Sequence, residues 1–267
     1  MNAEEDMVIS ARGLVTHFGE QIVHNGLDFD ILRGEIVGVV GPSGTGKSVL
    51  LREIIGLDQP TAGEINVFGQ NILAMPEDQR DVYERRWGVM FQEGALFSTL
   101  TLLENVAVPM HEHTKLSAEL IEELSSLKLM LVGLDPSSFH KRPSQISGGM
   151  RKRAALARAI ALDPELLFLD EPTAGLDPVS AAHFDELIKQ LSDALGLTVF
   201  LVTHDLDTLE AITDRVMVLY EGKVEALGPI AEVRQKARGW VKEYFSGPRG
   251  RAAQAGHAAG KQQGAGA

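Results

Sequence analysis

The sequence predicts an α/β fold in which buried central strands are combined with a separate lobe of helices. Three short apolar runs, 35–40, 166–169 and 198–202, have the length and continuity of strands that are covered on both faces. Each run ends in glycine or polar residues, and ligands bind at this edge of open α/β sheets. Between the first and second runs, the stretch 94–162 carries helix signals as a block and is expected to form the lobe.

The N-terminal part of the chain alternates strand, helix and turn signals. Residues 7–15 mix β-branched with polar positions, which indicates a strand at the edge of a sheet. Residues 48–57 predict a helix with one apolar face. Residues 60–63 then indicate a turn, and residues 64–68 predict a further strand. The apolar face of the helix consists of Leu50, Leu51, Ile54 and Ile55.

Two helix starts lie in the middle of the chain. Thr101 and Glu104 have the spacing of a capping box, and Ser117 is expected to cap a second helix. Acidic residues follow Ser117 closely, where the positive end of the helix dipole stabilises them. These residues are Glu119, Glu122 and Glu123, and the expected apolar face of this helix is Leu120, Ile121, Leu124 and Leu127. We therefore expect a helical subdomain over about 94–162.

The α/β pattern resumes in the C-terminal half. Residues 179–195 predict an amphipathic helix, and residues 215–220 and 223–226 predict a hairpin. From Arg251 onward the chain has almost no large apolar residue, so it cannot bury enough surface to fold. We expect one folded domain over 7–246 and a flexible tail over 247–267.

Composition excludes several classes of protein. The chain has 267 residues, a formal net charge of -12 and no cysteine. Non-specific nucleic-acid binding depends on Lys and Arg, so no nucleic-acid partner is expected. The absence of cysteine excludes a disulfide framework and cysteine-based metal sites, and it fits a reducing compartment. The acidic N-terminus lacks the features of a secretory signal, and no apolar run reaches the roughly 20 residues that cross a bilayer.

A glycine-rich motif follows the first apolar run. It matches G-x-x-x-x-G-K-S/T at every fixed position, with a buried strand before it and a helix after it. Its residues are Gly41, Pro42, Ser43, Gly44, Thr45, Gly46, Lys47 and Ser48. Curled glycine backbone aims N–H groups at phosphate oxygens, and the start of a helix adds its positive dipole end. In such loops Lys47 would reach the β- and γ-phosphates of ATP, and Ser48 would ligate Mg²⁺.

Two carboxylates follow the second apolar run. Asp170 and Glu171 lie at the end of the strand 166–169, and Pro172 gives the chain a rigid exit. Asp170 would hold Mg²⁺, and Glu171 would act as general base on the attacking water. The alternative is a solvated acidic strand end, which the phosphate loop upstream disfavours.

Five further motifs occur in a fixed order. Phe18 follows Thr-His, Gln92 lies in Phe-Gln-Glu, and Ser147 begins Ser-Gly-Gly-Met. Asp177 ends Ala-Gly-Leu-Asp, and His204 lies in Thr-His-Asp. Together with the phosphate loop and the acidic pair, this set resembles the ATP-binding subunits of ABC transporters.

The resemblance implies a P-loop NTPase fold with a RecA-like core, an antiparallel β subdomain and a helical subdomain. It also implies a homodimer that sandwiches two ATP molecules, in which Ser147, Gly148 and Gly149 of one subunit bind the γ-phosphate held by the other. A helix start of this kind is a natural anion site. Asp177 would join the same nucleotide site.

The remaining roles also follow from the resemblance. Phe18 would stack on adenine, Gln92 would ligate Mg²⁺, and His204 would bind the γ-phosphate and orient Glu171. Several of these features have plainer alternatives when taken alone. Ser147 would begin an ordinary helix, and residues 151–158 after it would be a solvated helix face. His204 would be an ordinary strand-end histidine, and Phe18 a core residue. His111 and His113 lack a third ligand nearby and are expected to be exposed loop residues rather than metal ligands.

The chain departs from the family pattern in the motif that contains Ser147, which is called the signature motif. Its last position is Met150 instead of glutamine, and its first is Ile146 instead of leucine. Met150 removes an amide that would contact the opposite nucleotide or the permease, whereas the serine and glycines that hold phosphate remain.

Two segments resemble the ATPases of the lipid-transport group linked to MCE proteins, including Mla phospholipid systems. They are residues 91–106 and 239–251, and the Ser-Gly-Gly-Met motif at 147–150 also resembles that of this group. This resemblance implies an inner-membrane permease of the MlaE type, an MCE-domain protein of the MlaD type and a small STAS-type regulator. The subunit would then lie in the cytoplasm, peripherally on the cytoplasmic face of the inner membrane.

Apolar residues near these segments are candidate contact sites. Ala95, Leu96, Phe97, Leu100, Leu102 and Leu103 would receive a permease helix, or half of them would pack the lobe. Trp240, Tyr244 and Phe245 would pack on a neighbouring subunit or on this one. Two other functions stay open: an importer ATPase for a polar solute, and a soluble ABC ATPase acting on DNA or ribosomes. The latter is disfavoured by the single cassette and the acidic balance.

Overall fold

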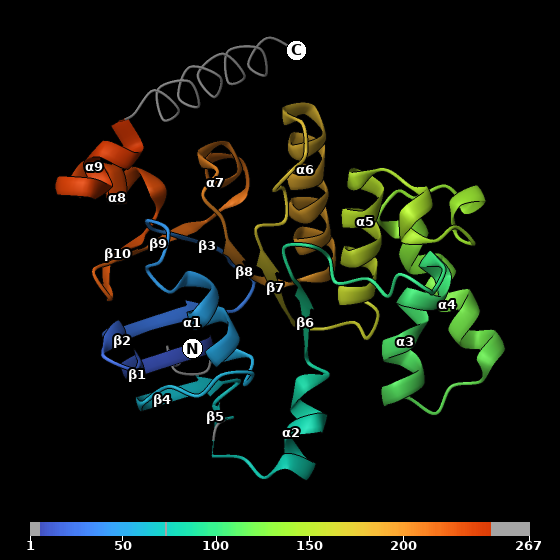
Figure 1. The fold of residues 1–267 in the computed structure, drawn as a ribbon, viewed down its shortest axis with the longest axis horizontal. Helices are drawn as coiled ribbons and strands as arrows, with labels where there is room; N and C mark the ends of the chain where they lie inside the picture. Colours follow the sequence, from blue (N-terminus) through green and yellow to red (C-terminus); the bar gives the residue numbers. More distant parts are fainter. Residues whose placement is uncertain (1–5, 73, 247–267) are drawn as a thin grey trace.

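The computed structural model describes residues 6–72 and 74–246, and the expected tail over 247–267 lies outside this part of the chain. Two sheets and a lobe of helices make up the molecule, with the helices α3, α4 and α5 on the side away from β1 and β2 (Figure 1). The expected fold class is confirmed: a RecA-like core, an antiparallel β subdomain and a helical subdomain are all present.

The larger sheet has six strands in the order β10-β9-β3-β8-β7-β6. Neighbouring strands run parallel, except that β10 is antiparallel to β9. The strands are β3 (Ile36–Val40), β6 (Trp87–Met90), β7 (Leu166–Asp170), β8 (Thr198–Val202), β9 (Arg215–Tyr220) and β10 (Lys223–Gly228). All residues of β3 and β8 are buried, which explains their continuous apolar sequences. The predicted hairpin is β9 and β10.

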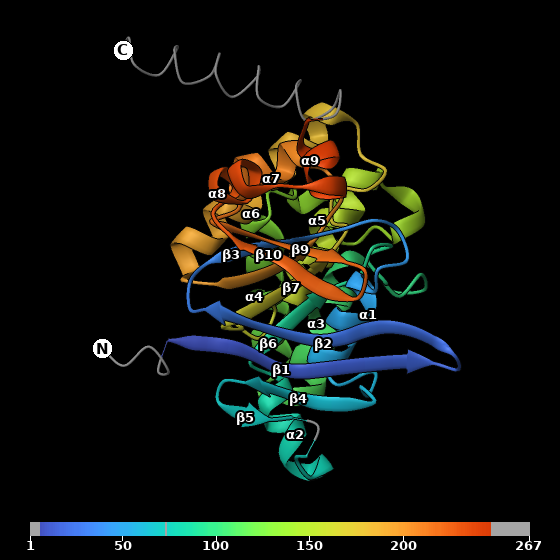
Figure 2. The ribbon, with the colours of Figure 1, turned by 90° about the vertical axis from the view of Figure 1, so that its left-hand side faces the viewer.

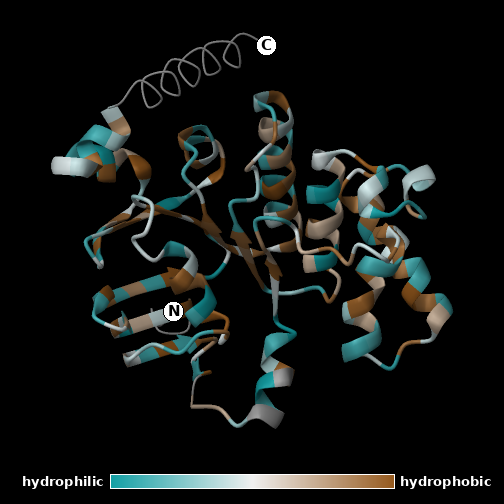
Figure 3. Cartoon of the chain, in the orientation of Figure 1, coloured by the Kyte–Doolittle hydropathy of each residue, from teal (hydrophilic) through white to brown (hydrophobic). Residues whose placement is uncertain are grey.

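Helices and the second sheet cover the two faces of the large sheet. One face packs on α1 (Lys47–Ile54) and on the antiparallel sheet, with Val37 and Phe200 among the buried contacts. The other face packs on α6 (Pro178–Leu195) and the helical lobe, with Ile36 and Val199 buried there. Figure 3 shows hydrophobic residues concentrated along these central strands. The phosphate loop therefore extends from a strand that is held from both sides.

The smaller sheet is antiparallel, with the order β2-β1-β4-β5 (Figure 2). Its strands are β1 (Met7–Phe18), β2 (Gln21–Leu32), β4 (Ala62–Val67) and β5 (Gln70–Asn71). The prediction of an edge strand at 7–15 is wrong, because β1 pairs with both β2 and β4. Its mixed composition has another cause: Ile9, Ala11 and Leu14 are buried in the core, whereas Ser10 and Arg12 between them are more exposed.

The helical lobe contains α3 (Leu102–His113), α4 (Ala118–Leu131) and α5 (Gly148–Ala159). Thr101 and Glu104 form the predicted capping box, and the Ser117 hydroxyl accepts from the Leu120 N–H. The predicted apolar face of α4 is partly wrong, since Leu120 and Leu127 are 40% and 53% exposed. The buried stripe is instead Ile121, Ser125, Lys128 and Leu129.

The remaining elements are short. They are α2 (Glu77–Glu84), α7 (Leu206–Ile212), α8 (Ile230–Lys236), α9 (Gly239–Ser246) and 3-10 turns at Pro136–Ser138 and Pro143–Gln145. The aromatic residues of α9 pack on this chain: Trp240 stacks on Tyr220 and Tyr244, and Phe245 is buried. Among the described residues, no helix is long and apolar enough to cross a membrane.

Candidate functional site

The phosphate loop connects the end of β3 to the start of α1. Gly46 is the N-cap of α1 and has φ 87°, a left-handed conformation that favours glycine. A Cβ at this position would lie 2.4 Å from Cγ1 of Val23, so only glycine fits. Among the described residues no side chain caps α1, which leaves its first N–H groups for an anion.

Lys47 lies at the mouth of the loop. Its Nζ donates to the carbonyl oxygens of Gly41 at 2.8 Å and Pro42 at 3.0 Å. Burial lowers the pKa of Lys47, and the nearby charges of Glu171 and Asp170 oppose that effect. A partly desolvated ammonium gains strongly from an anionic ligand, because fewer waters screen the pair.

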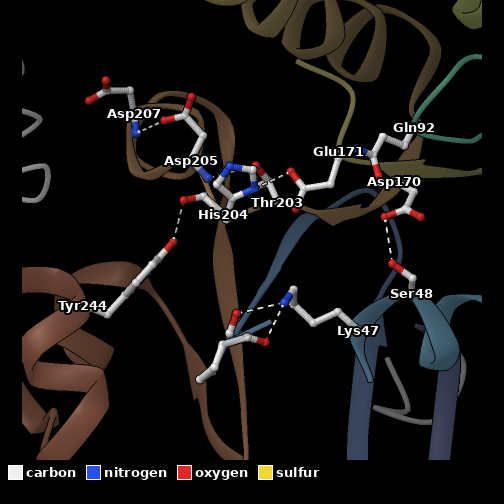
Figure 4. Close-up of polar contacts among 12 residues, drawn as sticks. Lys47, Ser48, Gln92, Asp170, Glu171, Thr203, His204, Asp205, Asp207 and Tyr244 are labelled. Atoms are coloured by element: carbon white, nitrogen blue, oxygen red, sulfur yellow. Dashed lines mark hydrogen bonds and ion pairs between the residues drawn. The ribbon is translucent and has the colours of Figure 1, made fainter. Parts of the chain in front are cut away.

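Ser48 and Asp170 bring two oxygen ligands together. The Ser48 hydroxyl donates to Oδ1 of Asp170 at 3.2 Å (Figure 4). Hard oxygens at neighbouring positions of an octahedral Mg²⁺ lie about 3 Å apart, so the pair fits a magnesium site. Burial raises the pKa of Asp170, and the Ser48 hydrogen bond counteracts it. A bound cation would favour the ionised carboxylate further.

Glu171 and His204 form the second polar pair of the site. Oε2 of Glu171 lies 2.8 Å from Nδ1 of His204, and the two side chains are 15% and 63% exposed respectively. The backbone of Glu171 has φ 47°, and its N–H donates to the Val202 carbonyl at 2.8 Å. This non-glycine left-handed turn carries a cost that surrounding contacts must offset. It turns the carboxylate from the end of β7 toward the end of β8 (Figure 4).

Lys152 is a site residue that the sequence did not reveal. It lies in α5, five residues after Ser147, and is 8% exposed. Its Nζ donates to the backbone carbonyl of Gln92, and to that of Glu171 at 3.3 Å. The alternative that residues 151–158 form a solvated helix face is therefore wrong at Lys152. Lys152 therefore connects α5 to the backbone at Gln92, after β6, and to the backbone at Glu171, after β7.

Tyr244 is a second residue missed at this site. Its hydroxyl donates to the backbone carbonyl of His204 at 3.1 Å, and burial raises the pKa of the phenol. The only sequence signal was the aromatic cluster at 240–245, which carried no hint of a partner 40 residues earlier.

The structure does not bring all the predicted residues to one place. Ser147 caps α5, accepting from the Met150 N–H at 3.3 Å, and Asp177 caps α6, accepting from Val179 and Ser180. Those hydrogen bonds lower the pKa of Asp177. Within the described residues, neither side chain bonds to Lys47, Ser48, Asp170 or Glu171. Ser147 lines instead an open cavity of about 360 Å³ beside α6.

Two other predictions concern isolated side chains. Phe18 ends β1 and is 54% exposed, so its ring is accessible to a stacking partner rather than buried in the core. His111 and His113 lie in the last turn of α3 and not in a loop. No group of three metal-binding side chains occurs among the described residues.

Comparison with known proteins identifies the family. Residues 24–174 match the family described as "ABC transporter". Sequence motifs, fold and match agree, and the chain belongs to the ABC transporter family as an ATP-binding, ATP-hydrolysing cassette.

Individual relatives indicate which kinds of ABC transporter this chain resembles. The chain is 39% identical to the intermembrane phospholipid transport system ATP-binding protein MlaF of Haemophilus influenzae, over 90% of each protein. It is 38% identical to MlaF of Escherichia coli K12, over 86% of this chain and 85% of the relative. It is also 38% identical to the probable ribonucleotide transport ATP-binding protein mkl of Mycobacterium leprae, over 91% of this chain and 70% of the relative.

Solved structures agree with this assignment. The ATP-binding cassette MJ0796, determined as a dimer in a post-hydrolysis state with ADP and Pi, has a TM-score of 0.76 and 30% identity, covering 87% of this chain and 100% of that one. CbiO1 of Clostridium perfringens, part of the transporter complex cbiONQ, has a TM-score of 0.79 and 27% identity, covering 95% and 100%.

Proposed function

We propose that this chain is the ATPase of an Mla-type transporter that moves phospholipid between membranes of the bacterial envelope. The observation that carries the proposal is the 39% identity to MlaF over 90% of both proteins. The subunit works at the cytoplasmic face of the inner membrane. Its partners are an MlaE-like permease, an MlaD-like MCE protein and a small STAS-type regulator.

The residues around Lys47 carry out ATP hydrolysis. Lys47 and the loop N–H groups bind the phosphates. Glu171 accepts a proton from the attacking water, and the 2.8 Å contact with His204 holds the carboxylate in one orientation. A hydrogen bond from the other ring nitrogen of His204 to the γ-phosphate requires a proton on both ring nitrogens, because carboxylate and phosphate oxygens both accept. Ser48, Asp170 and Gln92 would hold Mg²⁺, and the bound ion would neutralise charge on the phosphates.

Catalysis requires a second copy of the chain. In a single protomer, the Ser147 helix start makes no bond with the Lys47 site, although the resemblance assigns both to the γ-phosphate. In the proposed dimer, Ser147, Gly148 and Gly149 of each protomer complete the site of the other. The dimeric form of the MJ0796 cassette supports this arrangement.

The loop before α3, residues 94–101, is the proposed permease contact. Buried Asn105 holds this loop: its side chain accepts from the Phe97 N–H at 2.7 Å and donates to the Phe97 and Thr101 carbonyls. Arg158 donates to two more carbonyls of the loop. Leu102 and Leu103 pack the lobe, whereas Phe97 stays 50% exposed. The loop is therefore stiff and presents one large apolar side chain to a partner.

Co-purification with the membrane complex tests the proposal. Affinity-tagged protein expressed in its native host is expected to retain a permease and an MCE protein, and the complex is expected to move labelled phospholipid between vesicles with ATP. Recovery of a periplasmic solute-binding protein would contradict phospholipid transport.

A matched pair of variants tests the contact. Phe97→Ser is expected to lose the permease while ATP affinity stays unchanged. Leu57→Ser, which changes an apolar residue of similar exposure (58%) elsewhere, is expected to keep it. Equal retention by both variants would contradict the assignment of the loop.

A second candidate function is ribonucleotide transport. It is favoured by the 38% identity to the mkl proteins, whose names describe probable ribonucleotide transport. ATPase stimulation of the reconstituted complex by ribonucleotide, without stimulation by phospholipid, would favour this second candidate.

A further inference from the structure

Three buried polar side chains form a cluster directly beneath the phosphate loop. Thr16 comes from β1, His24 from β2 and Glu53 from α1, and the three are 2%, 0% and 0% exposed. Buried polar groups are costly unless they are hydrogen-bonded, so the contacts of this cluster decide its role.

Hydrogen bonds and one ion-pair contact join the three side chains. The Thr16 hydroxyl donates to Oε1 of Glu53 at 2.6 Å. Nδ1 of His24 lies 2.9 Å from the Thr16 hydroxyl oxygen and 3.1 Å from Oε2 of Glu53. On the other edge of the ring, Nε2 lies 3.2 Å from the carbonyl oxygen of Gly46, the N-cap of α1. The imidazole thus connects the core of the β subdomain to the phosphate loop.

The chemistry of the neighbours determines which atoms donate. A carbonyl oxygen can only accept, so the contact with Gly46 requires a proton on Nε2. The Thr16 proton is used toward Glu53, so the hydroxyl oxygen and Oε2 of Glu53 both present acceptors to Nδ1. Among the described residues, Oε2 of Glu53 has no hydrogen-bond partner and meets Nδ1 only in the 3.1 Å ion-pair contact.

The bond to Gly46 constrains the residue that follows. The Gly46 carbonyl accepts from His24 and also from the Leu50 N–H at 2.7 Å. In a planar trans peptide the C=O and the next N–H point in opposite directions. Holding this carbonyl toward β2 and α1 therefore aims the Lys47 N–H away from them, toward the mouth of the loop.

We infer that His24, held by Glu53 and Thr16, is a positioning residue that pre-orients the Gly46–Lys47 peptide for nucleotide phosphates. The inference rests on the proposed binding of phosphates by residues 41–48. A pre-oriented loop does not lose conformational freedom on binding, so its affinity is higher than that of the same loop without the bond. The net value of one hydrogen bond predicts a five- to tenfold effect, roughly, on the dissociation constant of ATP.

Two substitutions of His24 separate positioning from stability. In His24→Gln, the longer amide reaches about as far as Nε2 and can still donate to Gly46. In His24→Asn, the shorter amide retains the neighbours of Nδ1 but does not reach Gly46. We expect His24→Asn to bind ATP about five- to tenfold more weakly than wild type, and His24→Gln to stay within about twofold.

Calorimetric titration with ATP and thermal unfolding on the full chain supply the two readouts. Ser192→Ala is the control, because it removes a buried hydrogen bond to the Leu197 carbonyl at the far end of α6. It is expected to lower the melting temperature and leave ATP affinity unchanged. Equal affinities of the Asn and Gln variants, or affinities that follow melting temperature across all three variants, would overturn the inference.

A further variant covers the case in which single substitutions do not fold. Thr16→Val, His24→Leu and Glu53→Leu together replace the cluster by apolar side chains. Proteins often tolerate such a replacement of buried polar groups. This triple variant is expected to fold and to bind ATP more weakly, and wild-type affinity in it would also overturn the inference. Lys47→Ala distinguishes the two proposals: if it binds ATP normally, the phosphate site itself is wrong.

Discussion

The effect of replacing Asp185 by asparagine should depend on pH. We expect the variant's free energy of unfolding, relative to that of wild type, to be higher at neutral and alkaline pH than at acid pH. Asp185 lies in α6 and is 4% exposed. Its Oδ2 accepts from the Thr208 hydroxyl at 2.8 Å, whereas Oδ1 has no hydrogen-bond partner among the described residues. Burial raises the pKa of this carboxyl to about 7, and the charges of Asp205 and Asp207 add to the effect of burial.

The sign and size of the effect follow from linkage. The pKa of Asp185 in the folded state, about 7, lies above the ordinary value of 3.8. Between these values the folded state holds a proton that the unfolded state has lost, so the free energy of unfolding falls as pH rises. The slope is about 1.4 kcal/mol per pH unit, which amounts to about 4 kcal/mol across the window.

Denaturant unfolding of wild type and Asp185→Asn at several pH values between 4 and 8 measures this contribution. Asparagine does not titrate, and other groups cancel in the difference between the two proteins. The variant's free energy of unfolding, minus that of wild type, should rise by about 4 kcal/mol from pH 4 to pH 8 and level off above pH 7. A difference independent of pH would refute the claim that burial raises the pKa of this carboxyl.

Three further substitutions test individual residues. Glu171→Gln should keep ATP binding but lower turnover about 10²–10⁴-fold, measured as phosphate release, because it loses the general base; near-normal turnover would contradict that role. Lys47→Ala should weaken ATP binding in calorimetry, since the phosphates lose a cationic donor; unchanged affinity would argue against the phosphate loop. Thr101→Ala should lower the free energy of unfolding by about 1 kcal/mol, because the capping box is lost; an unchanged denaturation midpoint would show that the cap contributes nothing.

Local sequence patterns predicted those parts of the fold that depend only on neighbouring residues. The strands β3, β7 and β8 are covered on both faces, and their uninterrupted apolar runs report that directly. The position of β1 within its sheet depends on pairing with segments far along the chain, which alternation of residue types does not encode. Strand β2 contains Asn25 and Gly26, a typical turn pair, yet the chain continues as a strand with Gly26 at φ 76°.

In the site, too, contiguous motifs could be predicted and contacts between distant segments could not. The phosphate loop and the acidic pair are contiguous motifs, and the structure brings Ser48 to within 3.2 Å of Asp170. Lys152 and Tyr244 could not be found this way, because the hydrogen bonds that link them to the site are made to backbone carbonyls. Any residue type can supply a carbonyl, so such a contact leaves no trace in the sequence of the acceptor. The buried stripe of α4 was misassigned because that helix carries leucines on both faces.

The central claim is that two protomers share each nucleotide, with Lys47 of one facing Ser147 of the other. The most direct test is the molar mass of Glu171→Gln by light scattering, with and without MgATP, in solution and in its reconstituted membrane complex. The account predicts ATP-dependent pairing to twice the mass of one chain. An ATP-bound form that stays monomeric in solution and unpaired in the membrane complex would contradict it.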